Sequence, residues 1–216
     1  MQLYIYDHCP FCARVRMLAG YKKIPLELVY VPYSEEKMLI DLVGKKAVPV
    51  LVKDDGTASA ESLDILLWLD RNLSRYGAPI IGTEEDAEVD SWLNDALLPL
   101  QKIGYPRWSK LGLKEYVGEK DLKEWEGRKA PAIESFAKAL DETDRTAKEV
   151  TSLLERAGSL LAERGSLAAD SPLTMSEIKL FAFIRGFTSE PSILWPEGVR
   201  QWFDKRLEQS GMNRLV

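Results

Sequence analysis

Residues 2–31 read QLYIYDHCPFCARVRMLAGYKKIPLELVYV, and this stretch predicts a strand, a helix and a second strand. Leu3 and Ile5 share one side of a strand over residues 2–6, after which apolar residues from Phe11 onward lie at helical spacing. Pro25 then precedes a second strand-like run over residues 26–31. A helix between two strands is the βαβ pattern, which requires a parallel pair and a right-handed crossover.

The next residues continue the α/β pattern. We expect a helix over residues 34–43, with Ser34 as its N-cap and Gly44 just past its end. The apolar run over residues 48–52 predicts a buried strand, and Asp55-Gly56 predicts a hairpin to an antiparallel strand over residues 57–60. A helix over residues 62–73 is apolar on nearly every side, so we expect it to be covered on more than one side.

Beyond a turn-rich connector the sequence indicates helices only. A capping box at Thr174-Met175-Ser176-Glu177, with Leu173 and Ile178 placed as a hydrophobic staple, marks one helix start clearly. We therefore predict an α/β domain over residues 1–74, a linker over 75–83 and an all-α domain over 84–216. The helices are expected at residues 83–104, 124–140, 144–163, 176–187 and 197–209.

Composition narrows the class of protein. The chain has 216 residues, 45% of them apolar, which is ample for a packed core. Its net charge of -5 argues against a nucleic-acid partner, which favours a basic face. No apolar run approaches the length of a membrane span, and no basic region followed by an apolar run opens the chain. We expect a cytoplasmic protein that uses neither nucleic acid nor membrane.

Cys9 and Cys12 are the only two cysteines, separated by Pro10 and Phe11. Such a pair in a cytoplasmic chain is redox-active or half of a metal site, and a closed zinc site needs four ligands where His8 would be only the third. At a helix start, unpaired amides and the helix dipole stabilise a thiolate. We therefore predict that Cys9 is an acidic, exposed nucleophile and that Cys12 lies within disulfide reach one turn later.

Four other features have two readings each. Val48-Pro49 indicates an edge strand or bulge, or else a cis bond that turns the Val48 backbone toward the cysteines to pair with an extended peptide. Glu61-Ser62 is either an ordinary helix start or a grip for the carboxylate and ammonium groups of an amino acid. Arg14 and Arg16 either add positive charge near the thiols or are solvated helix residues. The aromatic residues that fit either the core or a cleft are Tyr105, Trp108 and Trp125.

Together these features resemble the thioredoxin-like domain of glutaredoxins and glutathione transferases. The segments MQLYIYDHCPFC, GKKAVPVLVKDDG, ESLDILLWLD and PLTMSEIKLFAFIRG, with the Trp195-Pro196 pair, are more narrowly similar to the bacterial glutaredoxin 2 family. The resemblance implies a thioredoxin-like α/β domain followed by an all-α domain, as in glutathione transferases. Phe11 departs from the pattern, since many members of the family have tyrosine there.

The resemblance also implies a function and site residues. It implies a glutathione-disulfide oxidoreductase, with glutathione as reductant and glutathionylated or disulfide-containing proteins as partners. Cys9 and Cys12 would be catalytic and Pro10 and Phe11 would support the redox loop. Glutathione would be held by the backbone of Val48 beside cis Pro49 and by Glu61 and Ser62. No metal is expected, and the family leans toward a monomer.

Other functions share this fold. An omega-like glutathione transferase would reduce dehydroascorbate with Cys9 alone, so the presence of Cys12 argues against it. A scaffold would hold an iron-sulfur cluster between two subunits through Cys9 and glutathione. A protein that inserts into membranes is the least favoured, because nothing apolar in the first predicted helix is long enough to span.

Overall fold

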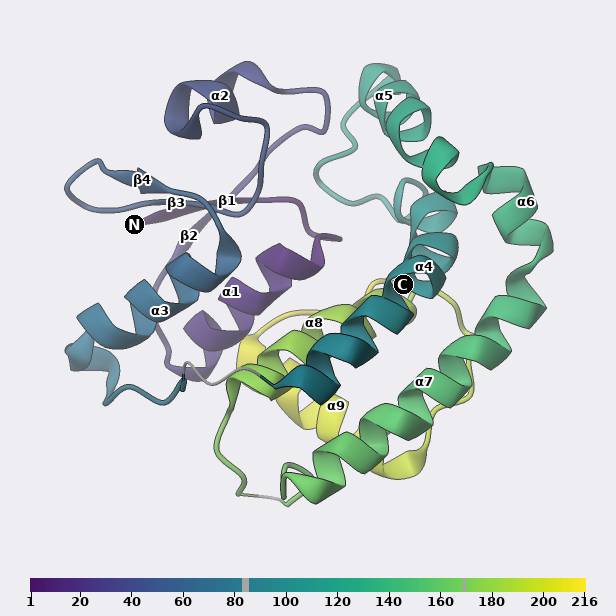
Figure 1. Ribbon diagram of the computed structural model, residues 1–216. Coiled ribbons are helices and arrows are strands. Elements are labelled where there is room, and N and C mark those ends of the chain that lie inside the picture. Colours follow the sequence, from purple (N-terminus) through teal and green to yellow (C-terminus); the bar gives the residue numbers. More distant parts are fainter. Residues whose placement is uncertain (83–85, 169) are drawn as a thin grey trace.

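The computed structural model describes residues 1–82, 86–168 and 170–216, with a small sheet near the N-terminus and helices after it (Figure 1). In chain order the elements are β1 (Gln2–Ile5), α1 (Pro10–Tyr21), β2 (Glu27–Tyr30), α2 (Lys37–Val43), β3 (Val50–Val52), β4 (Ala58–Ser59), α3 (Ser62–Asn72), α4 (Ala87–Trp108), α5 (Glu119–Lys129), α6 (Phe136–Asp141), α7 (Thr143–Glu163), α8 (Met175–Phe187) and α9 (Glu197–Ser210). Short 3-10 turns at Ser74–Tyr76 and Ala130–Ile133 follow α3 and α5.

The sheet confirms the predicted α/β pattern. Its strand order is β2-β1-β3-β4, with β1 parallel to β2 and antiparallel to β3, and β3 antiparallel to β4. Leu3 pairs with Leu28 on one side and with Leu51 on the other, which puts it in the middle of the sheet and fully buried. Helix α1 is therefore the crossover of a βαβ unit, and its N-terminus follows the end of the central strand β1.

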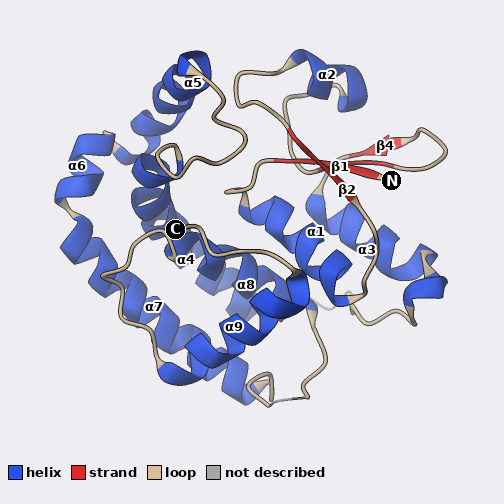
Figure 2. Ribbon diagram, turned by 180° about the vertical axis from the view of Figure 1, so that it is seen from behind, coloured by secondary structure: helices blue, strands red, loops and turns tan. Residues whose placement is uncertain are grey.

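Helices cover the two faces of the sheet unequally. Figure 2 shows α1 and α3 together on one face and α2 on the opposite side. Helix α1 also packs against α8 and α9, so one continuous core joins the sheet to the C-terminal helices. A Cβ atom at Gly20 would lie 2.3 Å from the Ser210 carbonyl oxygen, so only glycine permits the close approach of α1 to the end of α9. The division into 1–74, 75–83 and 84–216 remains a prediction.

The C-terminal part is helical, as predicted, and within its described residues there is no strand. The capping box is confirmed: the Glu177 amide donates to Thr174 Oγ1 at 3.2 Å, and the Thr174 amide donates to Glu177 Oε2 at 3.1 Å. The other carboxylate oxygen, Oε1, accepts hydrogen bonds from Trp202 Nε1 at 2.8 Å and Arg206 Nη2 at 2.6 Å. Glu177 thus joins α8 to α9 in the core.

Several predicted helix limits are wrong. Helix α2 begins at Lys37 after Glu36, because the Ser34 amide donates to Asp121 Oδ1 at 2.8 Å and Ser34 lies outside the helix. The helix predicted over residues 124–140 is interrupted after α5, where Pro131 lacks an amide proton and Glu134 has φ +66°.

Other limits differ by less. The predicted start at Thr83 lies outside the described residues, and α4 runs past Gly104 to Trp108. In α3 the N-cap is Glu61, while Ser62 is the first helical residue. Leu63 is 48% exposed, so α3 is less fully covered than its apolar sequence predicts. Within the described part of the chain, no helix combines the length and apolar character needed to cross a membrane.

Candidate functional site

The two cysteines lie at the start of α1, as predicted. Cys9 is the N-cap, with an extended backbone at φ -69° and ψ 121°, and Pro10 is the first helical residue. Cys12 lies in the first turn and is fully buried, and both thiols are free. Pro10 suits this position because the first helical amide has no intrahelical partner to lose. Three residues, Tyr6 to His8, separate Cys9 from the end of β1.

Cys9 is more acidic than an ordinary cysteine. A hydrogen bond from the Cys12 thiol, the positive charge of His8 and the amides of Phe11 and Cys12 lower the pKa of Cys9 to about 7, against the opposing effect of burial. Burial and the neighbouring Cys9 raise the pKa of Cys12 well above its usual value. The pair therefore divides into one thiolate and one thiol near neutral pH.

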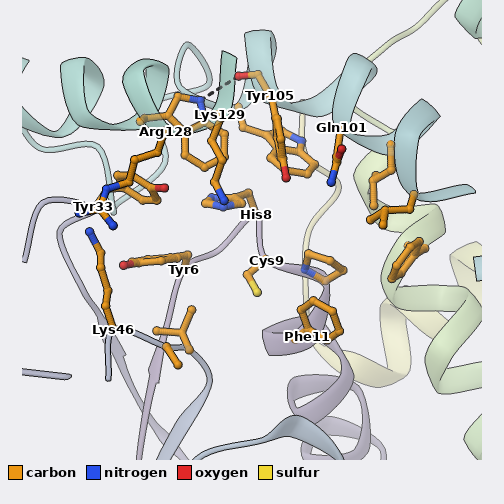
Figure 3. A pocket seen from close by; sticks show the side chains of 18 residues that line it. Tyr6, His8, Cys9, Phe11, Tyr33, Lys46, Gln101, Tyr105, Arg128 and Lys129 are labelled. Atoms are coloured by element: carbon orange, nitrogen blue, oxygen red, sulfur yellow. Dashed lines mark hydrogen bonds between the residues drawn. The ribbon is translucent and has the colours of Figure 1, made fainter. Parts of the chain in front are cut away.

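The prediction that Cys9 is exposed is wrong, since its residue is only 8% exposed. It lies instead in a pocket of about 400 Å³ between the end of β1, the loop before β3, and helices α4, α5 and α8 (Figure 3). Phe11 lines the same pocket and is 45% exposed at its edge. A substrate must enter this pocket to reach the sulfur of Cys9.

His8 forms the floor of the pocket beside Cys9. Its Nδ1 lies 2.6 Å from Glu115 Oε1, and its backbone amide donates to the same oxygen at 3.1 Å. Burial raises the pKa of Glu115, but hydrogen bonds and the charge of His8 outweigh it and hold that pKa below its usual value. Sequence analysis missed this pair, because Glu115 lies 107 residues away in the loop between α4 and α5.

The aromatic residues Tyr105, Trp108 and Trp125 both pack in the core and line the cleft. Trp108 and Trp125 are buried, and with Tyr105 they line the pocket. Trp125 Nε1 donates to the Tyr105 carbonyl at 2.9 Å, which fixes α5 against α4 (Figure 3). The readings as core and as cleft are therefore both correct.

Positive charge gathers at one end of the pocket, where Lys46, Arg128 and Lys129 line it (Figure 3). Lys46 and Arg128 both pair with Glu124, at 2.8 Å and 2.9 Å, and with Glu36. Lys129 has no ion pair with any residue that the structure describes; burial lowers its pKa, while the charge of Cys9 raises it. This end of the pocket suits a ligand that carries a carboxylate.

The two arginines after the cysteines are not simply solvated. Arg16 Nη1 donates to Asp7 Oδ1 at 2.6 Å, and the Arg14 guanidinium lies 4.8 Å from the centre of the Phe11 ring. Arg185 of α8 donates to the Asp7 carbonyl at 2.6 Å and to Asp7 Oδ1 at 2.8 Å. Asp7 thereby anchors the loop that carries His8 and Cys9. No pattern in the sequence indicates its partner Arg185.

The Val48-Pro49 bond is cis, as the second of the two readings predicts. That the Val48 backbone pairs with an extended peptide stays a prediction. Val48 lines the pocket, and so do its neighbours Lys46 and Ala47. Pro49 is not among the lining residues. The segment before β3 therefore lines the pocket together with the start of α1.

Glu61 and Ser62 lie at the N-terminus of α3 and do not line the pocket. Glu61 is exposed, has φ +69°, and pairs through Oε1 with Lys45 Nζ at 2.6 Å. Ser62 is buried. The structure thus brings Cys9, Pro10, Phe11 and Val48 together around the pocket, while Glu61-Ser62 remains a separate feature.

A titration of Cys9 should follow from its surroundings. Alkylation by iodoacetamide should be half-maximal near pH 7 and fall about tenfold per pH unit below it, because only the thiolate reacts. In Cys12→Ala the midpoint should move to higher pH, since the largest cause of the lowered pKa is removed. Cys12→Ser keeps a hydroxyl donor and should titrate near the wild type. Equal midpoints in all three proteins would exclude the Cys12 hydrogen bond as the cause.

Comparison with known proteins agrees with this geometry. The family model for the C-terminal domain of glutaredoxin 2 matches residues 88–215, and that for the N-terminal domain of glutathione S-transferase matches residues 3–77. Glutaredoxin 2 of Escherichia coli (strain K12) is 30% identical over 215 residues, covering 100% of this chain and 98% of that protein.

Solved structures give the same result. Glutaredoxin 2 from Salmonella typhimurium, crystallised in complex with glutathione, has a TM-score of 0.89 at 29% identity and covers 99% of this chain and 96% of that one. A glutathione S-transferase of Ceriporiopsis subvermispora has a TM-score of 0.71 at 13% identity, covering 97% and 96%, which shows the fold alone. Since a family model matches more than half of the chain and a relative aligns along its whole length, this protein belongs to the glutaredoxin 2 family.

Proposed function

We propose that this chain is a glutathione-dependent thiol-disulfide oxidoreductase that works through its CPFC motif. The observation that carries the proposal is Cys9, whose pKa is lowered to about 7 at the start of a helix, beside Cys12 and at the base of a pocket. A thiolate at neutral pH that is flanked by a second thiol is what thiol-disulfide exchange requires. Membership of the glutaredoxin 2 family supports the same reaction.

In the monothiol route Cys9 acts alone as nucleophile. Its thiolate attacks the glutathione sulfur of a protein-glutathione mixed disulfide and releases the protein thiol. A second glutathione then attacks the sulfur of the glutathione that is bound to Cys9. Cys9 leaves as a thiolate, and the two glutathiones form oxidised glutathione. The amides and the Cys12 thiol that stabilise the Cys9 thiolate favour both its formation and its departure.

In the dithiol route Cys12 resolves the intermediate. Cys9 attacks a protein disulfide, Cys12 then attacks Cys9, and the resulting Cys9-Cys12 disulfide is reduced by glutathione. Burial and the neighbouring Cys9 thiolate raise the pKa of Cys12, so Cys12 stays a thiol at first. Once Cys9 has formed the mixed disulfide, its negative charge no longer opposes the ionisation of Cys12. The side chain of Cys12 is buried beneath Cys9, so it is sheltered from outside thiols.

The glutathione site in this proposal follows the family pattern. The Val48 backbone beside cis Pro49 pairs with the cysteinyl part of glutathione, Glu61 and Ser62 hold the γ-glutamyl end, and Pro10 and Phe11 shape the redox loop. The Salmonella relative was crystallised in complex with glutathione, which supports glutathione as the ligand. The cationic end of the pocket, with Lys46 and Lys129, supplies charge for a carboxylate.

Glu61 offers a direct check on that placement. Glu61→Gln removes the negative charge that would face an ammonium group, so the KM for glutathione should rise about tenfold, the equivalent of one exposed charge-assisted contact. The Cys9 alkylation rate should stay unchanged. Asp64→Gln, an exposed acidic residue one turn later in α3, is the matched control. An unaltered KM in Glu61→Gln would remove Glu61 from the glutathione site.

The partners in this proposal are glutathione and proteins that carry glutathionylated or oxidised cysteines. We propose that the chain works as a monomer, because the residues that line the pocket come from one chain. A reducing cytoplasm is the compartment in which two free thiols are maintained.

The test is a comparison of two activities of the wild-type protein. We expect a high initial rate of glutathione-dependent reduction of the mixed disulfide between glutathione and 2-mercaptoethanol, with little conjugation of glutathione to an aryl halide. Brisk conjugation with slow reduction would show a transferase on the same fold and would overturn the proposal.

A further inference from the structure

The geometry points to His8 as the residue that moves protons during thiol exchange, with Glu115 as the side chain that positions it. This inference rests on the proposed function, because it assigns a role within that reaction. Thiol exchange includes two proton transfers. The departing thiolate must gain a proton, and the thiol of the incoming glutathione must lose one. Cys9 cannot serve in either step, since its sulfur is the nucleophile and then the leaving group.

The tautomer of His8 is fixed by Glu115. Glu115 is fully buried, and its lowered pKa keeps it ionised, so its oxygens only accept hydrogen bonds. At 2.6 Å from Glu115 Oε1, Nδ1 of His8 must therefore carry the hydrogen. The other nitrogen, Nε2, is then free either to accept a proton or to donate one.

Nε2 is available to a substrate. It has no hydrogen-bond partner in the described part of the chain, and His8 lines the pocket next to Cys9 (Figure 3). The imidazole is held in place by stacking on Trp108, with ring centres 4.9 Å apart, and by Trp125, whose ring edge lies against it at 4.8 Å. A proton-transfer group that is held in one orientation pays little reorganisation during reaction.

Few other groups around the pocket can do this work. Burial raises the pKa values of Tyr6 and Tyr116 far above neutrality, so both phenols stay protonated. The Tyr116 hydroxyl lies 3.2 Å from His8 Nδ1, on the side away from Nε2. The remaining titratable residues that line the pocket are Tyr33, Lys46, Tyr105, Arg128 and Lys129.

Glu115 carries a second sign of function. Its Oε2 is buried and has no hydrogen-bond partner among the described residues. An unpaired buried carboxylate oxygen is costly, and natural proteins keep such groups where chemistry needs them.

The steps balance as follows. Protonated His8 donates from Nε2 to the departing thiolate as Cys9 bonds to the glutathione sulfur, giving the free thiol and neutral His8. Neutral His8 then takes the thiol proton of a second glutathione. The resulting thiolate attacks the Cys9-bound glutathione sulfur, releasing oxidised glutathione, the Cys9 thiolate and protonated His8. The net reaction consumes the mixed disulfide and one glutathione.

Substrates whose departing thiolates differ in basicity distinguish proton transfer by His8 from a purely structural role. An alkyl thiolate is basic and needs the proton, whereas an aryl thiolate such as thionitrobenzoate leaves without it. We expect His8→Gln to slow reduction of the glutathione–2-mercaptoethanol disulfide about a hundredfold, within the usual range for general acid catalysis. The comparison is made in single turnovers without free glutathione and per Cys9 thiolate, as measured by alkylation, because His8 also lowers the pKa of Cys9 and serves the second glutathione. Under these conditions, reduction of the glutathione–thionitrobenzoate disulfide should change little. Glu115→Gln should show a smaller loss with the same selectivity.

Glu119→Gln is the matched control, because Glu119 is an exposed glutamate four residues further along with no ion pair in the described chain. It should reduce both disulfides as the wild type does. Equal losses on both disulfides in His8→Gln, or no loss on either, would overturn the inference. If the wild type itself reduced neither disulfide, the proposed function would fail instead.

A second measurement needs no variant, so it decides the question even if His8→Gln does not fold. In single turnovers without free glutathione, the wild type should reduce the alkyl disulfide more slowly in D2O than in H2O, because a proton moves in that transition state. The aryl disulfide should show a much smaller solvent isotope effect. Equal isotope effects on both would exclude proton transfer to the departing thiol.

Discussion

The Cys9→Ser variant is expected to lose glutathione-dependent reduction of a mixed disulfide entirely, while Cys12→Ser keeps most of it. Loss of the nucleophile removes the covalent intermediate, so the rate should drop by a factor on the order of 10³ or more, to that of the uncatalysed exchange. Cys12→Ser keeps a donor beside Cys9, so the thiolate remains stabilised. The measurement is the initial rate with the glutathione–2-mercaptoethanol disulfide.

A protein disulfide should reverse the outcome for Cys12. The dithiol route needs the second thiol to resolve the intermediate, so Cys12→Ser should stop after one attack and trap a mixed disulfide that mass spectrometry detects. Ser152→Thr, at an exposed serine of α7, checks that a hydroxyl change elsewhere is harmless to Cys9 alkylation. Equal loss of mixed-disulfide reduction in Cys9→Ser and Cys12→Ser would contradict the assignment of Cys9 as sole nucleophile.

The second large effect is expected on stability, at Glu177. Glu177→Gln should lower the free energy of unfolding by about 3–5 kcal/mol, because the Arg206 guanidinium would remain buried without its counter-charge. The glutamine amide would also have to face either the Thr174 amide or the donors of α9, and all of these are donors. Loss of the capping box alone would cost only about 1 kcal/mol.

Denaturant unfolding followed by tryptophan fluorescence measures this difference. Glu208→Gln is the control, since Glu208 is an exposed glutamate of the same helix as Arg206, and its replacement should stay within about 0.5 kcal/mol of the wild type. Loss of the capping box alone accounts for about 1 kcal/mol. A loss no larger than that in Glu177→Gln would therefore mean that the buried ion pair makes no net contribution to stability.

Local signals in the sequence predicted most of the fold. The βαβ unit, the Asp55-Gly56 hairpin and the Thr174–Glu177 capping box depend on residues a few positions apart, and all three are confirmed. The helix predicted over residues 124–140 is wrong, because Pro131 interrupts the helical pattern of the apolar residues.

The site could be predicted only in part. A helix start and two thiols are local, so the acidity of Cys9 followed from the CPFC motif. Its depth in a pocket did not, because Tyr105, Trp108 and Trp125 close over it from helices far along the chain. The partners Glu115 of His8 and Arg185 of Asp7 likewise depend on tertiary packing, which no spacing in the sequence reveals.

Arg185, which holds the backbone of Asp7, also has a consequence for the order in which the site is completed during synthesis. Chains are made from the N-terminus, and early segments begin to fold before later ones exist. Both cysteines emerge from the ribosome before Arg185, which lies 178 positions after Asp7 and fixes its carbonyl. A nascent chain therefore carries the thiols long before the pocket around them can close. The surroundings of Cys9 are therefore complete only after Arg185 has been synthesised and has packed against Asp7.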